Sequence, residues 1–208
     1  MKQKLFLLFF CALLIFITLG FSNGSLKQSE SSYSLSDTTE SKEIMKTVQR
    51  AYDIEAEAAY TFDLSKFPTV FINDPRFNVS PGTLETIREL TNNPSLESAG
   101  WLDYKMAYYS WTRDAVIHAE TVKEKAQAEN RDLTQKEKNS LVDSRGRSAP
   151  ARVDQSARTN PLKFLSVNVN GDVAIVIVDD GPMTVQLTLV LVDGHWFIAA
   201  YKGIAVHP

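Results

Sequence analysis

The chain has 208 residues, 44% of them hydrophobic and 23% charged, with a formal net charge of −3. These values are typical of a globular protein with one domain and additional segments. The slightly acidic balance lacks the clustered positive charge that neutralises phosphates, so we expect no nucleic-acid partner. Cys11 is the only cysteine. The residues after it therefore cannot form a disulfide or a thiolate metal site.

Residues 1–24 have the features of an export signal. Lys2 and Lys4 precede a long apolar run, and small and polar residues follow it up to Gly24, a pattern typical of a cleaved signal peptide. An uncleaved anchor is the alternative, because residues 5–21 could form roughly 25 Å of helix against a hydrocarbon core of ~30 Å. Both alternatives predict an exported chain, extracellular or at the cell surface, with the membrane as a partner if the segment is retained.

Residues 25–38 are predicted to be a flexible tether, because they are rich in serine and threonine and poor in large apolar side chains. The predicted domain spans residues 39–208. A capping-box pattern, Asp37-x-x-Glu40, predicts a helix that starts there and runs to about Phe62. Neighbouring serine and threonine residues offer alternative caps.

One face of this first helix is apolar, and several of its members are alanines, which favours close packing against a sheet. Its stripe consists of Ile44, Val48, Ala51, Ala58 and Phe62. Glu55 fills the gap in that stripe, four residues after Ala51, and is therefore expected to point where the apolar face points.

The next segments predict a short strand and more helix. Residues 69–72 are apolar and lie between two prolines, which favours an edge strand. Ser80-Pro81 predicts the start of a helix that ends near Leu90. Residues 94–160 then hold a long helical pattern from Leu96 to Asn130, and a second capping box, Thr134-x-x-Glu137, opens another helix.

The last forty-odd residues predict an antiparallel meander of four strands. Three turn signals separate runs of strand-forming residues: Asn170-Gly171, Asp180-Gly181-Pro182 and Asp193-Gly194. The whole pattern predicts an α+β fold, in which a long N-terminal helix packs against a curved antiparallel sheet of about five strands.

Several stretches resemble the nuclear transport factor two-like superfamily, which also contains ketosteroid isomerases. They are "FPTVFIND" after the first helix and "GDVAIVIVDDG…VQLTLVLVDGHWFI" near the end, and the resemblance covers about residues 39–90 and 160–206. It implies a cone, in which the sheet wraps around the first helix and encloses a pocket. The superfamily has no catalytic signature of its own, so the resemblance implies no particular reaction. The segment 94–160 departs from the family pattern and reads as a helical insertion.

The insertion carries an aromatic stripe at helical spacing. Its members are Trp101, Tyr104, Tyr108, Trp111 and His118. One interpretation is a surface that binds a small apolar, aromatic or sugar-like ligand at the mouth of the cone, together with Tyr52, Tyr60 and Phe71. The other interpretation is that the stripe only docks the insertion on the sheet.

An enzyme of this family would need a carboxylate base in the cone and a hydrogen-bond donor beside it. Glu55, Asp63, Asp74 and His118 are the candidate catalytic groups. Ordinary structural roles compete with each: an ion pair for Glu55, and turn positions for Asp63 and Asp74. The three histidines, His118, His195 and His207, show no metal-ligand spacing, so we predict neither a metal site nor another cofactor.

The sequence therefore predicts an exported or membrane-tethered binding module with an unknown ligand. The alternative is a small isomerase, dehydratase or cyclase that uses a carboxylate base in the cone. A third interpretation is a homodimer through a sheet face formed by Thr184, Gln186 and Thr188, which alternate with the inward-facing Val185, Leu187 and Leu189. The alternative is that these polar residues simply face water.

Overall fold

Helix α1 (Thr39–Thr61) begins the part of the chain that the computed structural model describes, which comprises residues 38–142, 146, 148 and 162–207. Thr38 is its N-cap, and the Thr38 hydroxyl accepts a hydrogen bond from the Ser41 amide at 3.1 Å. The cap is thus one of the neighbouring threonines rather than Asp37. Phe62 ends the helix in the left-handed conformation, with φ of 62°.

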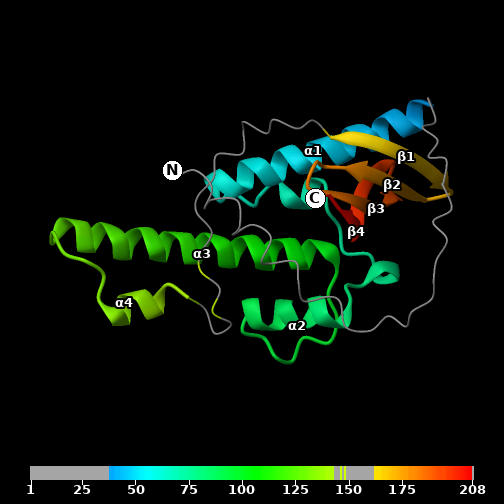
Figure 1. Ribbon diagram of the computed structural model, residues 1–208. Coiled ribbons are helices and arrows are strands. Elements are labelled where there is room, and N and C mark those ends of the chain that lie inside the picture. The colour runs from blue at the N-terminus through cyan, green and yellow to red at the C-terminus, as the bar shows by residue number, and fades with distance from the viewer. Residues whose placement is uncertain (1–37, 143–145, 147, 149–161, 208) are drawn as a thin grey trace, which may run out of the picture. The chain divides into compact units, whose positions relative to one another are not determined.

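Four antiparallel strands form one sheet in the order β1-β2-β3-β4, as the turn signals predict (Figure 1). Their bounds are β1 (Lys163–Asn170), β2 (Val173–Asp179), β3 (Met183–Val192) and β4 (His195–Val206). The turn between β3 and β4 is Asp193-Gly194, with φ angles of 50° and 78°. Positive φ at both positions suits the right-handed twist of a hairpin.

Two interruptions in the pairing of β3 with β4 add one residue each to β4. Thr188 pairs with Ala200 and Leu189 with Ile198, which leaves Ala199 as the extra residue. A second bulge leaves Ile204 unpaired in the same way. Each bulge reverses the alternation of side chains beyond it, because a strand has a period of two residues.

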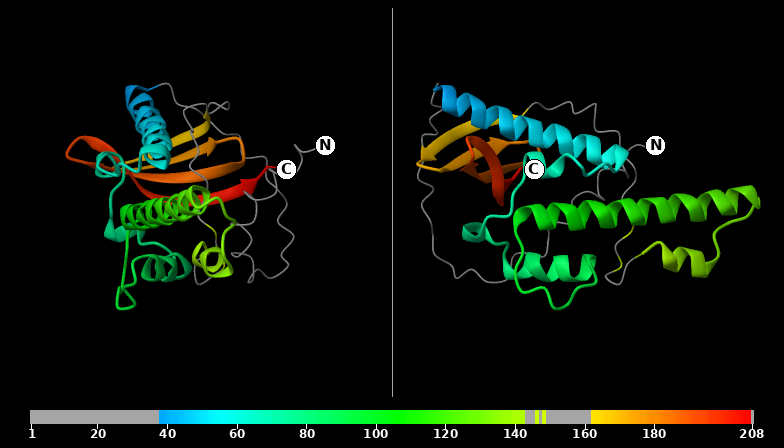
Figure 2. Two further views of the ribbon diagram at one scale, coloured as in Figure 1. Left: turned by 90° about the vertical axis from the view of Figure 1, so that its left-hand side faces the viewer. Right: turned by 180° about the vertical axis from the view of Figure 1, so that it is seen from behind.

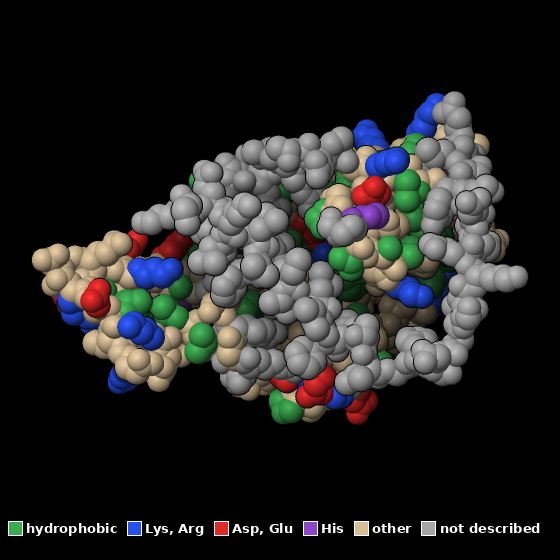
Figure 3. All heavy atoms as spheres, in the orientation of Figure 1, with side chains coloured by type: hydrophobic (Ala, Val, Ile, Leu, Met, Phe, Trp, Pro, Cys, Tyr) green, Lys and Arg blue, Asp and Glu red, His purple; other side chains and the backbone are tan. Residues whose placement is uncertain are grey.

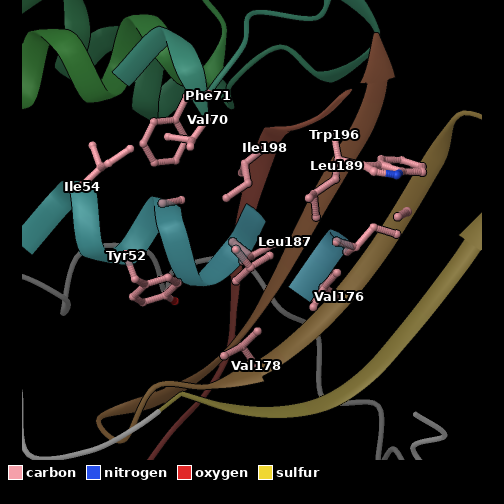
Figure 4. Close-up of a cluster of buried hydrophobic side chains, with 14 of the residues drawn as sticks. Tyr52, Ile54, Val70, Phe71, Val176, Val178, Leu187, Leu189, Trp196 and Ile198 are labelled. Atoms are coloured by element: carbon pink, nitrogen blue, oxygen red, sulfur yellow. The ribbon is translucent and has the colours of Figure 1, made fainter. Parts of the chain in front are cut away.

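The main core lies between α1 and the sheet (Figure 4). Ile44, Val48, Ala51 and Ala58 of the predicted stripe are at most 1% exposed. They pack with inward-facing residues of the strands, among them Val176, Val178, Val185, Leu187, Leu189 and Ile198. The predicted packing of the first helix on the sheet is therefore confirmed, as is the inward direction of the apolar residues of β3.

The prediction of a strand at residues 69–72 is wrong, although the segment does lie at the edge of the sheet. Phe67–Thr69 is a turn of 3₁₀ helix, η1, and the following residues make only an isolated parallel bridge between Phe71 and Ile198. Two backbone hydrogen bonds hold it: Ile72 donates to Ile198 at 3.1 Å, and Ile198 donates to Val70 at 2.9 Å. The segment does lie along the edge of the sheet, beside β4.

Helices α2 (Pro81–Leu90) and α3 (Trp101–Ala128) pack on each other through a second, smaller core of Ile87, Ala99 and Ala107. Helix α3 starts five residues later than the pattern from Leu96 predicts. A second 3₁₀ turn, η2 (Pro75–Phe77), precedes them, and α4 (Gln135–Ser140) follows. Figure 2 shows α3 beside the sheet and α2 beyond it.

The distal half of α3 and the short α4 form a helical hairpin that extends past the sheet (Figures 1 and 2). Arg131 holds its turn, because the guanidinium bonds both Glu137 oxygens at 2.7 Å. Thr134 and Glu137 form the predicted capping box of α4. Figure 3 shows acidic and basic side chains intermixed over the tip of this hairpin.

None of the helices in the described ranges is long and apolar enough to cross a membrane. The predicted signal or anchor lies outside those ranges, and so do residues 25–37 of the predicted tether and most of residues 143–161. The predicted homodimer through Thr184, Gln186 and Thr188 stays a prediction.

Candidate functional site

A row of stacked aromatic rings runs from β4 along α3. Tyr201 stacks on Trp101, with ring centroids 5.2 Å apart and ring planes 3° from parallel. Trp101 stacks on Tyr104 at 4.9 Å, Tyr104 on Tyr108 at 6.1 Å, and Trp111 follows at 6.3 Å. All five side chains are half-buried. We call Tyr201, Trp101, Tyr104, Tyr108 and Trp111 the aromatic row.

Helical geometry explains four members of the row. Positions 101, 104, 108 and 111 are three or four residues apart, so their side chains lie along one face of α3. Offset stacking between neighbouring rings is a favourable arrangement, worth about 0.5–1.5 kcal/mol per pair beyond the burial of area. The row therefore has a fixed geometry, in which neighbouring rings engage the faces of Trp101 and Tyr104.

Tyr201 is the member that the sequence pattern did not single out. Trp196 and Ile198 face the core, so strict alternation would place residue 201 on the opposite face of β4. The bulge at Ala199 reverses the alternation, and Tyr201 packs against the same core as Trp196 and Ile198. Sequence reasoning had no signal for this bulge other than the small residues Ala199 and Ala200.

Burial raises the pKa of the Tyr201 phenol above its ordinary range, and the nearby charges of Asp180 and Glu55 act in the same direction. Its hydroxyl donates to the sulfur of Met183 at 3.0 Å. Tyr201 therefore stays neutral and acts as a hydrogen-bond donor. Tyr52 is buried nearby, and its hydroxyl donates to Asp180 at 3.4 Å.

Glu55 forms an ion pair with Lys105, one residue after Tyr104 on α3. The side chains are 19% and 14% exposed, and the contacting oxygen of Glu55 is shielded from solvent. The Lys105 ammonium also lies 5.0 Å from the centroid of Trp101 and 5.4 Å from that of Phe71. Lys105 thus joins α1, α3 and the segment after η1 at the inner side of the aromatic row.

Phe71 lies behind the row rather than in it. It is 3% exposed and packs edge-to-face on Phe67, with centroids 5.6 Å apart, while Phe67 packs in the same way on Tyr109 at 5.0 Å. These contacts attach α3 to the core. Two members of the stripe also dock α3, because Trp101 packs against the main core and Tyr104 against the second core. Tyr109 and the rings of the row are all half-buried, so both interpretations of the stripe stay open.

The other predicted site residues lie elsewhere. Tyr60 is 48% exposed near the end of α1. Asp63 is exposed and accepts the Ser65 amide, and this hydrogen bonding lowers the pKa of its carboxyl. Asp74 caps η2 and binds Arg76. His118 is exposed on the hairpin and lies 3.2 Å from the Ser140 hydroxyl.

Asp74 belongs to a structural ion-pair network. Arg76 contacts it through two nitrogens at 2.8–3.2 Å and reaches Asp172, in the turn between β1 and β2, at 2.8 Å. Hydrogen bonding from Arg76 lowers the pKa of the Asp74 carboxyl, although burial opposes the shift. This network links the segment before α2 to the sheet, and it leaves Asp74 engaged by a cation.

In the described part of the chain, no three histidine, cysteine, aspartate or glutamate side chains converge in a way that could hold a metal ion. None of the family models, curated proteins and solved structures compared with this chain matches it. The resemblance to the nuclear transport factor two-like superfamily therefore stays a prediction from the residues that carry it.

Proposed function

We propose that this protein is an exported or membrane-tethered binding module of the nuclear transport factor two-like type, which holds a small planar ligand against the aromatic row. The aromatic row is the observation that carries the proposal. Five half-buried rings in a fixed arrangement offer a continuous apolar surface for an aromatic or sugar-like body. The ligand is held by aromatic contacts and burial, and no covalent bond is made or broken.

The surroundings of Glu55 support binding over catalysis. A general base has to reach a proton of the substrate with its charge available, whereas the Glu55 carboxylate is paired with Lys105. Tyr201 and Tyr52 supply neutral hydroxyl groups, but Met183 and Asp180 already accept from them. The same groups suit a rigid wall around an apolar ligand, since their polar atoms are satisfied within the protein.

The proposal includes the cone, with the sheet curving around α1 and α3 closing its side. Three observations support it: the shared core of α1 and the sheet, the pairing of Glu55 on α1 with Lys105 on α3, and the bulges in β4. Bulges bend a strand and increase its twist. The exported location rests on the apolar run at residues 5–21.

A ligand screen against the full chain tests this function. Small aromatic compounds and short oligosaccharides are added one at a time, and tryptophan fluorescence reports binding, because Trp101 and Trp111 belong to the row. We expect at least one class to give saturable quenching. Tyr108→Ala should weaken that binding roughly 5- to 150-fold, since base- and ring-stacking contacts are worth about 1–3 kcal/mol each.

Tyr60→Ala is the matched control, because it removes an exposed aromatic ring of α1 outside the row. It should leave the affinity unchanged. Equal loss in both variants, or a hit that binds Tyr108→Ala as tightly as the wild-type protein, would contradict the location of the site. Turnover of a bound compound that Glu55→Gln abolishes would support the carboxylate enzyme instead.

A further inference from the structure

A separate pocket of about 320 Å³ lies where α1, η1 and the start of β4 meet. Its polar lining consists of Thr47, Arg50, Thr69 and His195. Pro68 and Phe197 contribute accessible apolar surface, whereas Val70 and Trp196 are almost fully buried. The volume is at the lower end of the range for small-molecule sites. None of these residues belongs to the aromatic row.

Hydrogen bonds orient two of the polar groups, Arg50 and Thr69. Thr47 and Arg50 are three residues apart on α1, so both side chains leave the same face of the helix. Arg50 donates from Nη2 to the Thr69 hydroxyl at 3.2 Å. Thr69 in turn donates to the Lys66 carbonyl at 2.6 Å, so its hydroxyl is anchored and serves to orient the guanidinium.

The charge of the pocket is positive. Arg50 makes no ion pair within the described residues, and no aspartate or glutamate lines the pocket. The neighbouring acids are engaged or point elsewhere: Asp53 accepts from Gln49 at 2.9 Å, and Glu57 pairs with Lys66 at 2.7 Å. Asp193 lies in the exposed turn before His195 and is not part of the lining.

We propose that this pocket binds the oxyanion group of a small ligand, a carboxylate or a phosphate. Arg50 has five N–H donors, of which one is used by Thr69, so its fork remains able to bind two oxygens. The Thr47 hydroxyl on α1 and the His195 ring at the start of β4 add further hydrogen-bond donors. Pro68 and Phe197 provide the accessible apolar surface on which the body of such a ligand packs.

The experiment is an NMR titration of the full ¹⁵N-labelled chain with inorganic phosphate and, in a second arm, with acetate. Sodium chloride at equal ionic strength corrects for screening. We expect saturable shifts of the amides of Thr69, Val70 and residues 195–197, with a dissociation constant of about 1 mM for these small probes. The arm with the tighter binding identifies the oxyanion that the pocket prefers.

Arg50→Gln should weaken this binding at least tenfold, because the charged fork is the principal contact. Arg113→Gln is the matched control: it removes the same charge from an exposed arginine of α3 and should leave the titration unchanged. His195→Gln, a second exposed position, should weaken binding several-fold with the fold intact. Shifts that do not saturate with either probe, or equal binding by Arg50→Gln and Arg113→Gln, would overturn the proposal.

Discussion

The helix position of Glu55 determines which way its side chain points, whereas its ion-pair partner determines its chemical role. Its spacing in α1 predicts that it points with the apolar stripe, and its carboxylate is indeed largely buried. The partner, Lys105, lies fifty residues further on, in a segment for which the sequence offered no pairing rule. Whether a buried carboxylate is a base or half of an ion pair depends on such a distant residue.

We predict that the Glu55–Lys105 pair contributes stability as a unit. Lys105→Met should lower the free energy of unfolding by about 2 kcal/mol, because it leaves a largely buried carboxylate without its cation. Adding Glu55→Leu should restore part of that loss, since the two apolar side chains can pack together. Urea unfolding of the two single variants and the double variant gives the coupling energy, and purely additive effects would contradict the pairing.

Asp74 provides a prediction about acid stability. Its pKa in the folded protein lies below the ordinary value of 3.8, chiefly because of Arg76. The folded state therefore binds fewer protons than the unfolded state in this range, and the stabilisation is complete above the ordinary pKa and is lost as the pH falls through the lowered one. As the pH falls below about 5, the free energy of unfolding should decrease less for Asp74→Asn than for the wild-type protein.

Urea unfolding at several pH values measures this difference. Arg76→Gln should flatten the same part of the profile, because it removes the cause of the lowered pKa. If the free energy of unfolding of Asp74→Asn fell with pH as steeply as that of the wild-type protein, other carboxylates would account for the loss of stability in acid.

At the scale of single elements, the start of α3 depends on a residue far from it. Asn73 accepts a hydrogen bond from the Asp103 amide at 3.1 Å and donates to the Asp103 carboxylate at 2.8 Å. It thus serves as the N-terminal cap that Gly100 itself, without a side chain, cannot provide. The sequence pattern placed the helix start at Leu96, because a cap contributed from another segment leaves no local signal.

Gly100 is predicted to be required by this contact. A Cβ added there would overlap the Asn73 side chain, so Gly100→Ala should lower the free energy of unfolding by about 1–3 kcal/mol. Gly82→Ala is the control, since a Cβ at Gly82 in α2 meets no atom within 4 Å. Thermal unfolding of the two variants checks this, and equal stability would contradict the close approach. Alanine at position 82 should be neutral or slightly stabilising because of its helix propensity.

The segment at residues 69–72, between Pro68 and Pro75, illustrates a different limit of sequence patterns. Its apolar residues and flanking prolines favour an edge strand, and it does pair with β4. Pro68, however, lies in the first turn of η1, where its fixed φ is compatible with a helical turn. Core packing of Phe67 and Phe71 then decides the backbone path, and only one bridge remains.

For the molecule as a whole, the four-stranded meander, α1, α2 and α4 follow from local signals. Turn residues, caps and periodicity act over a few positions, so they can be recognised without knowing the fold. The aromatic row follows in part, since four of its members lie on one helix. Tyr201, the Glu55–Lys105 pair and the oxyanion pocket join segments far apart in the chain, and their positions depend on tertiary packing.

The sheet is more deeply buried than the tip of the helical hairpin, and this predicts a gradient of local stability along the chain. The central strands β2 and β3 have neighbours on both sides and contribute buried residues such as Val176 and Leu187. Their amides should exchange with solvent only through global unfolding, whereas those around Arg131 at the hairpin tip should exchange orders of magnitude faster. Hydrogen-exchange mass spectrometry measures both, and similar protection of the tip and the sheet would contradict this gradient.

The continuity of α3 has a mechanical consequence. The helix has 28 residues and contains neither glycine nor proline, so it has no built-in hinge along roughly 42 Å of length. Its first turn carries Trp101, and its far end carries the charged hairpin. A tilt of about 5° at the tryptophan displaces the far end by roughly 4 Å over that length. Helix α3 therefore amplifies small rearrangements near Trp101 into larger displacements at its far end, and a fluorophore attached beside Ala126 would report them.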